Sequence, residues 1–132
     1  MQMRLPWSTG PADASEGPHS AMASRFKLKR HRDVVPFLRA SMRLRKEAAA
    51  APGNVGLGLA ANPFTKTFWT LSTWESQDAL RAFVAGEPHR AVVARFKDAS
   101  ASADFTFWDI AAPATPPTWQ QATIRLAGRA AR

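Results

Sequence analysis

One stretch of the chain holds residues that could do acid–base chemistry. The segment FWTLSTWESQDALRAFVAGEPH, residues 68–89, carries aromatic residues, a carboxylate at Glu75 and an imidazole at His89. His89 follows Pro88 at the expected start of a helix, where the positive helix end favours a neutral imidazole near pH 7. A neutral imidazole can take a proton from a phenol, so His89 is the candidate catalytic base. The alternative is a first-turn histidine that binds a loop carbonyl.

Other polar and aromatic side chains could bind a substrate beside such a base. The candidate substrate-binding residues are Trp69, Trp74, Arg45, Ser24, Asn62 and Trp108. The tryptophans could form an aromatic wall for a flat ligand, although large aromatics in strands are more often core or dimer interface. The arginine could reach a carboxylate or phenolate, and the serine and asparagine could donate hydrogen bonds inside a pocket.

Patterns for metal or nucleotide binding are absent from the sequence. The chain has no cysteine, which excludes a disulfide scaffold, a thiolate zinc site and a cysteine nucleophile. His31 and His89 lack carboxylate partners at a useful spacing for a metal. The glycine patterns of phosphate-binding and dinucleotide-binding loops do not occur, nor does a Gly-x-Ser-x-Gly elbow. We therefore expect no metal and no cofactor.

Positive charge is concentrated in one part of the chain. The formal net charge is +8, and nine lysines and arginines lie between Arg25 and Lys46 against one acid, Asp33. Such a block could attract nucleic acid or another anionic partner. Stacking aromatics are not interleaved with these arginines as nucleic-acid sites require, so we expect a solvated face rather than a nucleic-acid interface.

The composition fits one ordinary globular domain. The 132 residues are 45% hydrophobic and 21% charged. No apolar run approaches the ~18 residues that a membrane helix needs. The N-terminal residues lack the apolar core of a secretory signal, so we expect a cytoplasmic protein with no membrane partner.

The periodicity of the middle of the chain predicts the elements that would position these residues. Alternation predicts strands, and apolar spacing of three and four predicts helices. The expected order is a strand at 22–30, a helix at 33–51, strands at 55–62 and 65–74, helices at 76–86 and 87–97, and a strand at 103–110. This β-α-β-β-α-β order predicts an α+β, ferredoxin-like fold with a four-stranded antiparallel sheet.

The two ends of the chain differ from this middle. Residues 1–21 are predicted as an irregular lead-in, in which Leu5, Pro6 and Trp7 could dock onto the body. Residues 22–110 form the predicted domain, and 111–132 a proline-rich linker with a basic tail. The tail could be an amphipathic helix whose apolar members are Trp119, Ala122, Ile124 and Leu126.

Two smaller expectations concern which side chains face inward. In the strand at 55–62 one face carries only Gly56, Gly58 and Ala60, which permits close approach by a helix, a ligand or another chain. In the helix at 87–97 the expected inward residues are Val92, Val93 and Phe96.

The order of these elements resembles that of the dimeric α+β barrel superfamily. The resemblance is carried by FWTLSTWESQDALRAFVAGEPH, followed by VVARF and DFTFWDI, and covers about residues 22–110. More narrowly, the strand that ends in Trp-Glu-Ser at 74–76 is similar to that of antibiotic-biosynthesis-monooxygenase-like proteins. The resemblance implies a homodimer in which two sheets pack face to face. It also implies an apolar pocket between each sheet and its helices.

The resemblance further implies cofactor-independent oxidation of an aromatic or polyketide-like ligand. In such chemistry the substrate phenolate gives an electron to dioxygen, and the protein supplies a base, a dry cavity and orientation. His89 would be the base, and Trp69, Trp74 and Arg45 would orient the substrate. The alternative is a non-enzymatic ligand-binding or structural dimer.

A weaker alternative is a haem-binding protein. Haem-degrading relatives carry an asparagine, a tryptophan and an axial histidine at positions that align, from Trp74, with Ser24, Phe83 and Val93. Valine cannot ligate iron. His89 lies one helical turn earlier and would have to take its place.

Overall fold

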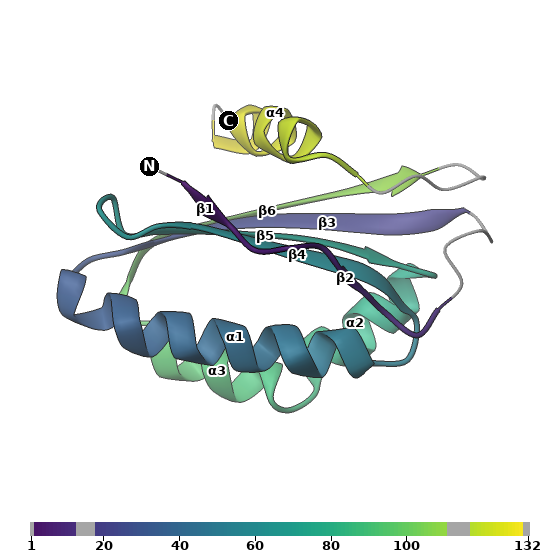
Figure 1. Ribbon diagram of the computed structural model, residues 1–132, viewed down its shortest axis with the longest axis horizontal. Coiled ribbons are helices and arrows are strands. Elements are labelled where there is room, and N and C mark those ends of the chain that lie inside the picture. Colours follow the sequence, from purple (N-terminus) through teal and green to yellow (C-terminus); the bar gives the residue numbers. More distant parts are fainter. Residues whose placement is uncertain (1, 13–17, 111–116, 131–132) are drawn as a thin grey trace.

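A computed structural model describes residues 2–12, 18–110 and 117–130. One antiparallel sheet divides the molecule, with three helices on one face and a fourth on the other (Figure 1). The elements are β1 (Met3–Arg4), β2 (Ser8–Thr9), β3 (His19–Leu28), a short 3-10 helix (His31–Asp33), α1 (Val34–Ala50), β4 (Asn54–Asn62), β5 (Thr67–Trp74), α2 (Gln77–Ala85), α3 (His89–Phe96), β6 (Ser100–Ile110) and α4 (Trp119–Ala130). We call the face under α1, α2 and α3 the helix face, and the opposite one the outer face.

The strands are ordered β1-β4-β5-β3-β6, and each neighbouring pair is antiparallel. The short strand β2 also pairs with β4, so the N-terminal segment extends that edge of the sheet. The body β4-β5-β3-β6 with its helices has the β-α-β-β-α-β order of a ferredoxin-like fold. The predicted fold class is therefore confirmed.

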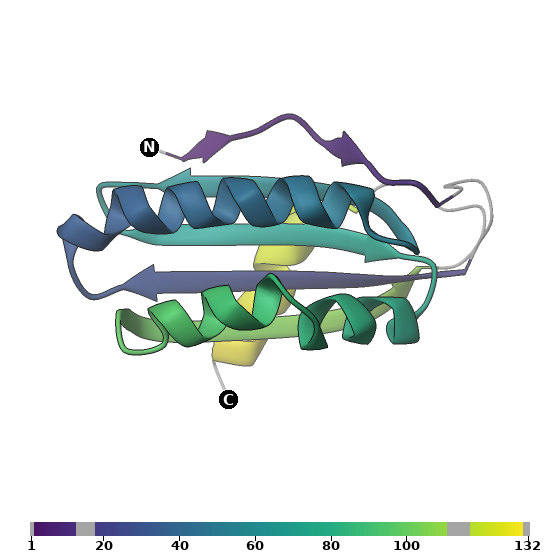
Figure 2. The ribbon, with the colours of Figure 1, turned by 90° about the horizontal axis from the view of Figure 1, so that it is seen from below.

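A phenylalanine cluster holds α1 and α3 on the helix face. The ring of Phe37 in α1 lies 4.6 Å from that of Phe68 in β5 and 5.0 Å from that of Phe96 in α3. Gly53 has a φ of +83°, which allows the turn from α1 into β4. This cluster packs α1 and α3 against the sheet. Figure 2 shows both helices over the same face of the sheet.

Side-chain caps define the start of α2 and the turn before α3. Ser76 is the N-cap of α2, and its Oγ accepts a hydrogen bond from the Ala79 N–H at 3.1 Å. Glu87 Oε2 accepts one from the Ala91 N–H at 3.2 Å. These caps place His89 at the first residue of α3.

On the outer face, α4 crosses the sheet (Figure 2). Ala122 and Leu126 of α4 are buried against Ala23 of β3 and Leu71 of β5. Trp7 of the N-terminal segment packs against the same cluster, as expected of a docking anchor. The face carrying the two glycines receives it, since a Cβ built on Gly56 would collide with the Trp7 ring.

The structure corrects several details. Strand β3 begins at His19 rather than at residue 22, and the irregular lead-in contains β1 and β2. Val93 does not face inward, because it is 47% exposed. Ile124 is 65% exposed on α4, whereas the other predicted apolar residues of the tail pack on the sheet. Residues 111–116 of the predicted linker lie outside the described residues.

Candidate functional site

Three hydroxyl side chains form a polar strip at the centre of the helix face. Ser24 of β3 is opposite Thr70 of β5, and their hydroxyl groups share a hydrogen bond. Ser72 follows two residues later on β5 and therefore points to the same face. One hydrogen suffices for the bond between Ser24 and Thr70, so the other remains available to a ligand.

An aromatic pair links this hydroxyl strip to His89. The Nε1–H of Trp74 donates to Ser72 Oγ at 3.0 Å. The ring of Phe83 in α2 lies 5.4 Å from that of Trp74, and the imidazole of His89 packs edge-on against Phe83 at 5.7 Å. These contacts form one continuous line from β5 through α2 to the start of α3.

His89 has the properties of a neutral general base. Its Nδ1 is buried and has no hydrogen-bond partner among the described residues. Burial lowers the pKa of His89 below its usual 6.5, because a charged imidazole loses hydration inside the protein. The backbone of Val84 opposes this pKa shift in part. From the sequence, the positive helix end was expected to keep His89 neutral, whereas in the structure burial is the main cause of the lowered pKa.

The helices leave one part of the helix face open. Phe105 and Phe107 of β6 lie on this face, opposite Ser24 and Met22 of β3. They are nevertheless 37% and 58% exposed. Met22 and Thr70 are half-buried although both strands are internal to the sheet. Solvent therefore reaches Thr70 and the two phenylalanines of β6, whereas Ser24 and Ser72 are buried.

This arrangement can bind and deprotonate a flat hydroxylated molecule. The phenylalanines, Trp74 and Phe83 offer aromatic surface, and the hydroxyl strip can donate to or accept from polar oxygens. A neutral imidazole beside them can accept a proton. We call these residues, namely Ser24, Thr70, Ser72, Trp74, Phe83, His89, Phe105 and Phe107, the helix-face site.

The predicted site residues separate into groups. The structure brings Ser24, Trp74 and His89 into the helix-face site. It places Trp69 and Trp108 on the outer face, where they pack against the cluster beneath α4. A common wall of all three tryptophans therefore does not form.

Two other predicted residues lie away from the helix-face site. The Nη2–H of Arg45 donates to the carbonyl of Pro6 at 2.8 Å and so ties α1 to the N-terminal segment. Asn62 Oδ1 accepts from the N–H groups of Phe64 and Thr65 in the β4–β5 turn. Asn62 pairs with Thr67, seven residues from Trp74, which is about 23 Å along a strand.

Sequence reasoning missed Thr70, Ser72 and the exposure of Phe107. The period-2 pattern of β5 already placed both hydroxyls on the face of Trp74, so that signal could have found them. The open side at Phe107 has no sequence signal, because it depends on where α2 and α3 lie over β6.

Neither a metal centre nor a membrane span is found in the described ranges. No group of three or more His, Asp or Glu side chains there could hold a metal ion. No described helix is long and apolar enough to cross a membrane. Within the basic block, Arg25 is paired with Asp104 at 2.9 Å, while the side chains of Arg39, Arg43 and Lys46 are exposed.

Comparison with known families gives one match. Residues 24–131 match the family described as "Domain of unknown function (DUF3291)". The matched range includes α4, so this helix is part of the domain that the family shares. A search of curated proteins found no match.

Solved structures with the same fold include proteins described as oxygenases or monooxygenases, together with proteins whose descriptions name no activity. A variant of SnoaB, a cofactor-independent oxygenase from Streptomyces nogalater, has a TM-score of 0.59 and 16% identity over 70% of this chain and 92% of that one. Rv0793 from Mycobacterium tuberculosis has a TM-score of 0.59 and 16% identity over 68% and 92%. A protein of Fusobacterium nucleatum, provisionally described as a monooxygenase, has a TM-score of 0.68 and 8% identity over 85% and 53%. The chain thus spans about half the length of that last protein. At these identities the likeness establishes the fold.

Proposed function

Because the chain belongs to the family described as "Domain of unknown function (DUF3291)" and has the fold of antibiotic biosynthesis monooxygenases, we propose that it is a small cofactor-independent oxygenase. Its substrate class is a flat phenolic molecule, aromatic or polyketide-like, that enters the helix-face site from the β6 side. The observation that carries the proposal is the half-buried His89 imidazole, whose Nδ1 is buried and unpaired among the described residues, at the end of a line of aromatic and hydroxyl side chains.

In the proposed reaction, His89 accepts the phenol proton and leaves an electron-rich phenolate. The phenolate gives one electron to dioxygen, and the two radicals combine into a peroxide on a ring carbon. The protonated His89 returns its proton to the peroxide, and the resulting hydroperoxide loses water together with the hydrogen of that ring carbon. This leaves a ketone, so one oxygen atom ends in the product and the other in water. The hydroxyl pair of Ser24 and Thr70 holds a substrate oxygen, and the phenylalanines exclude water.

The test is oxygen consumption with a panel of tricyclic and tetracyclic phenols. Removal of a general base costs about 10²- to 10⁴-fold in rate, so His89→Gln should lose at least 100-fold. His31→Gln is the matched control, because His31 is exposed and binds the Phe64 carbonyl in a turn. Full activity in His89→Gln would remove the base from the proposal. A panel without any oxygen uptake would favour the non-enzymatic ligand-binding alternative.

We also propose the homodimer that the resemblance implies, in the cytoplasm. In such a dimer the partner would face the outer surface, which α4 and Trp7 already cover in part. The partner would therefore contact α4 as well as the neighbouring strands. A molar mass by light scattering near twice the 14.4 kDa of one chain would support the dimer, and the mass of a single chain would contradict it.

A further inference from the structure

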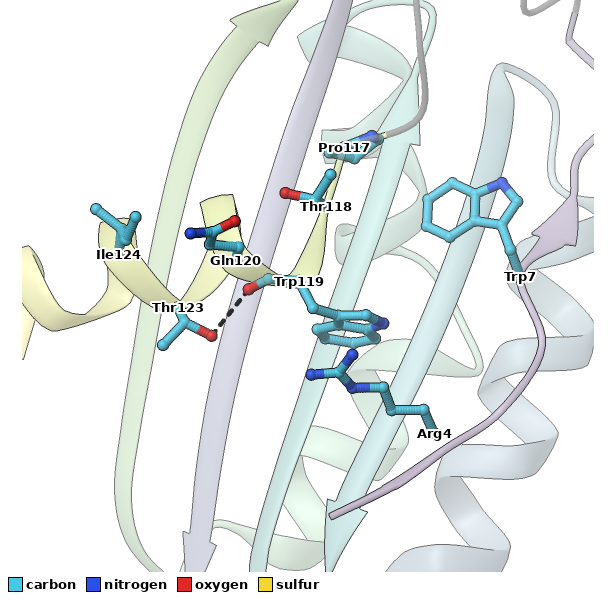
Figure 3. Close-up of a pocket in the computed structure, with 8 residues that line it drawn as sticks. All are labelled: Arg4, Trp7, Pro117, Thr118, Trp119, Gln120, Thr123 and Ile124. Carbon is cyan, nitrogen blue, oxygen red and sulfur yellow. Dashed lines mark hydrogen bonds between the residues drawn. The ribbon is translucent and has the colours of Figure 1, made fainter.

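A groove of about 830 Å³ lies on the outer face, between the N-terminal segment and the first turns of α4 (Figure 3). It is separated from the helix-face site by the sheet itself. Its lining residues are Arg4, Trp7, Pro117, Thr118, Trp119, Gln120, Thr123 and Ile124. We call it the outer groove.

Two tryptophans meet over a glycine in the outer groove. A Cβ built on Gly58 would lie 3.1 Å from the ring of Trp7 and 3.2 Å from that of Trp119. The absence of a side chain at this position lets both indoles approach the sheet. The groove therefore presents aromatic surface from both ends of the chain.

Arg4 lies beside this aromatic surface and has no acidic partner among the described residues. Its guanidinium carbon is 5.9 Å from the centre of the Trp119 ring, and Figure 3 shows the guanidinium next to that ring. The Nε–H donates to Gln2 Oε1 at 2.8 Å, and the two Nη groups are left free of this hydrogen bond. No carboxylate of the described residues forms an ion pair with Arg4.

Hydrogen bonds hold both walls of the groove in place. On the N-terminal side, Arg4 pairs with Ala60 of β4, and the next residue, Leu5, donates its N–H to the Leu59 carbonyl at 2.9 Å. On the other side, Thr118 Oγ1 accepts from the Gln121 N–H at 3.1 Å, and Gln121 Oε1 accepts from the Thr118 N–H at 2.9 Å. This reciprocal cap fixes the first turn of α4, which carries Trp119.

We propose that the outer groove binds a planar aromatic carboxylate. The ring of the ligand packs on the indoles of Trp7 and Trp119, and its carboxylate accepts two hydrogen bonds from the Nη groups of Arg4. The unpaired cation supplies the charge complementarity that selects an anion over a neutral ring. This site is distinct from the oxygenase site proposed above and does not depend on it. It lies on the face that the partner would cover in the proposed dimer, so the ligand would bind there at the dimer interface.

The experiment is calorimetric titration of the full chain with 2-naphthoate, and with 2-naphthalenemethanol as the neutral analogue. Loss of one charge-assisted contact costs about tenfold in affinity, so Arg4→Gln should bind 2-naphthoate about tenfold more weakly than wild type. Arg4→Lys should keep part of the affinity because it keeps the charge. The neutral analogue should bind wild type and Arg4→Gln equally.

Arg125→Gln is the matched control. Arg125 lies 4.7 Å over the ring of Trp108 on the same face, but it does not line the groove. It should bind 2-naphthoate like wild type, and so should Thr70→Val in the helix-face site. Equal affinity of wild type and Arg4→Gln, or no binding at all, would overturn the proposal. A loss of affinity in Thr70→Val alone would also overturn it, since it would move the ligand to the helix face.

Discussion

The two faces of the sheet are covered in different ways. The helix face is covered by α1, α2 and α3, which are joined to the strands by short turns inside the predicted domain. The outer face is covered by the two ends of the chain, through Trp7 and α4. The helix face keeps a buried hydroxyl strip and a histidine, whereas the outer face offers glycines and tryptophans.

This difference separates chemistry from recognition. The proposed oxygenase chemistry needs a base and hydroxyl donors in fixed positions, and packing within the domain holds these side chains on the helix face. The outer face has aromatic surface and the cation of Arg4, which is unpaired among the described residues, and the residues that line its groove include no general base. Substitutions beneath α1 and beneath α4 test whether the segments that cover the two faces differ in their contribution to the free energy of unfolding.

The largest effect is expected at the core of the helix face. Phe37→Ala removes a ring that contacts those of Phe26, Phe68 and Phe96. Truncation of a buried phenylalanine costs about 3–5 kcal/mol, and urea denaturation would measure this loss in the free energy of unfolding. A loss below about 1 kcal/mol would mean that α1 is not packed on the sheet as described.

A smaller effect is expected beneath α4. Leu126→Ala should cost about 2–3 kcal/mol, near the low end for leucine, because the terminal helix can settle into the space. Ile124→Ala on the same helix is the control and should change the free energy of unfolding by less than about 0.5 kcal/mol, since that side chain is exposed. Equal effects of the two substitutions would show that α4 does not dock through the Leu126 side.

Replacement of glycine by alanine should change the stability of the protein in opposite directions at Gly58 and at Gly128. Gly58→Ala puts a Cβ 3.1–3.2 Å from two indoles, so Trp7 and Trp119 must shift, at a cost of about 1 kcal/mol. Gly128→Ala in α4 meets nothing within 4 Å and should stabilise the protein by up to about 1 kcal/mol through helix propensity. Thermal unfolding would compare them, and a stabilising Gly58→Ala would place the indoles elsewhere.

The smallest effect concerns pH. Burial lowers the pKa of His89 in the folded chain, so below pH 6.5 the unfolded chain binds a proton that the folded chain does not. The contribution of His89 to the free energy of unfolding is therefore fully present above pH 6.5, and it falls as the pH is lowered towards the pKa of the folded state. The difference in unfolding free energy between wild type and His89→Gln should shrink or reverse over that range. A difference independent of pH would contradict the burial of the imidazole.

The sequence was sufficient for the body of the fold because local patterns and tertiary packing agree there. The alternation of residues 65–74 and the apolar spacing of residues 76–86 predicted the strand and the helix that the structure contains. Val93 was assigned to the wrong side because only part of a short helix faces the sheet. Periodicity alone does not fix the rotation of the helix about its axis.

The candidate site was predicted less completely than the fold. Of the predicted residues, Ser24, Trp74 and His89 lie on the helix-face side of the sheet, whereas Trp69 and Trp108, grouped with them from the sequence, lie on the other face. The position of α4 was not predictable, because a short helix gains its stability from the surface on which it docks. The outer groove depends on that docking, and the sequence indicated only its parts, namely the small-residue face of β4, the anchor at Trp7 and the apolar side of the tail.

The central claim is that a phenolic ligand binds on the helix face, and ligand-induced shifts in nitrogen NMR signals test it most directly. Titration with 1-naphthol should shift the imidazole signals of His89 and the indole Nε1 signal of Trp74. The indole signals of Trp69 and Trp108, beneath α4, should stay unchanged. Shifts confined to the outer-face tryptophans, with His89 unaffected, would contradict the account.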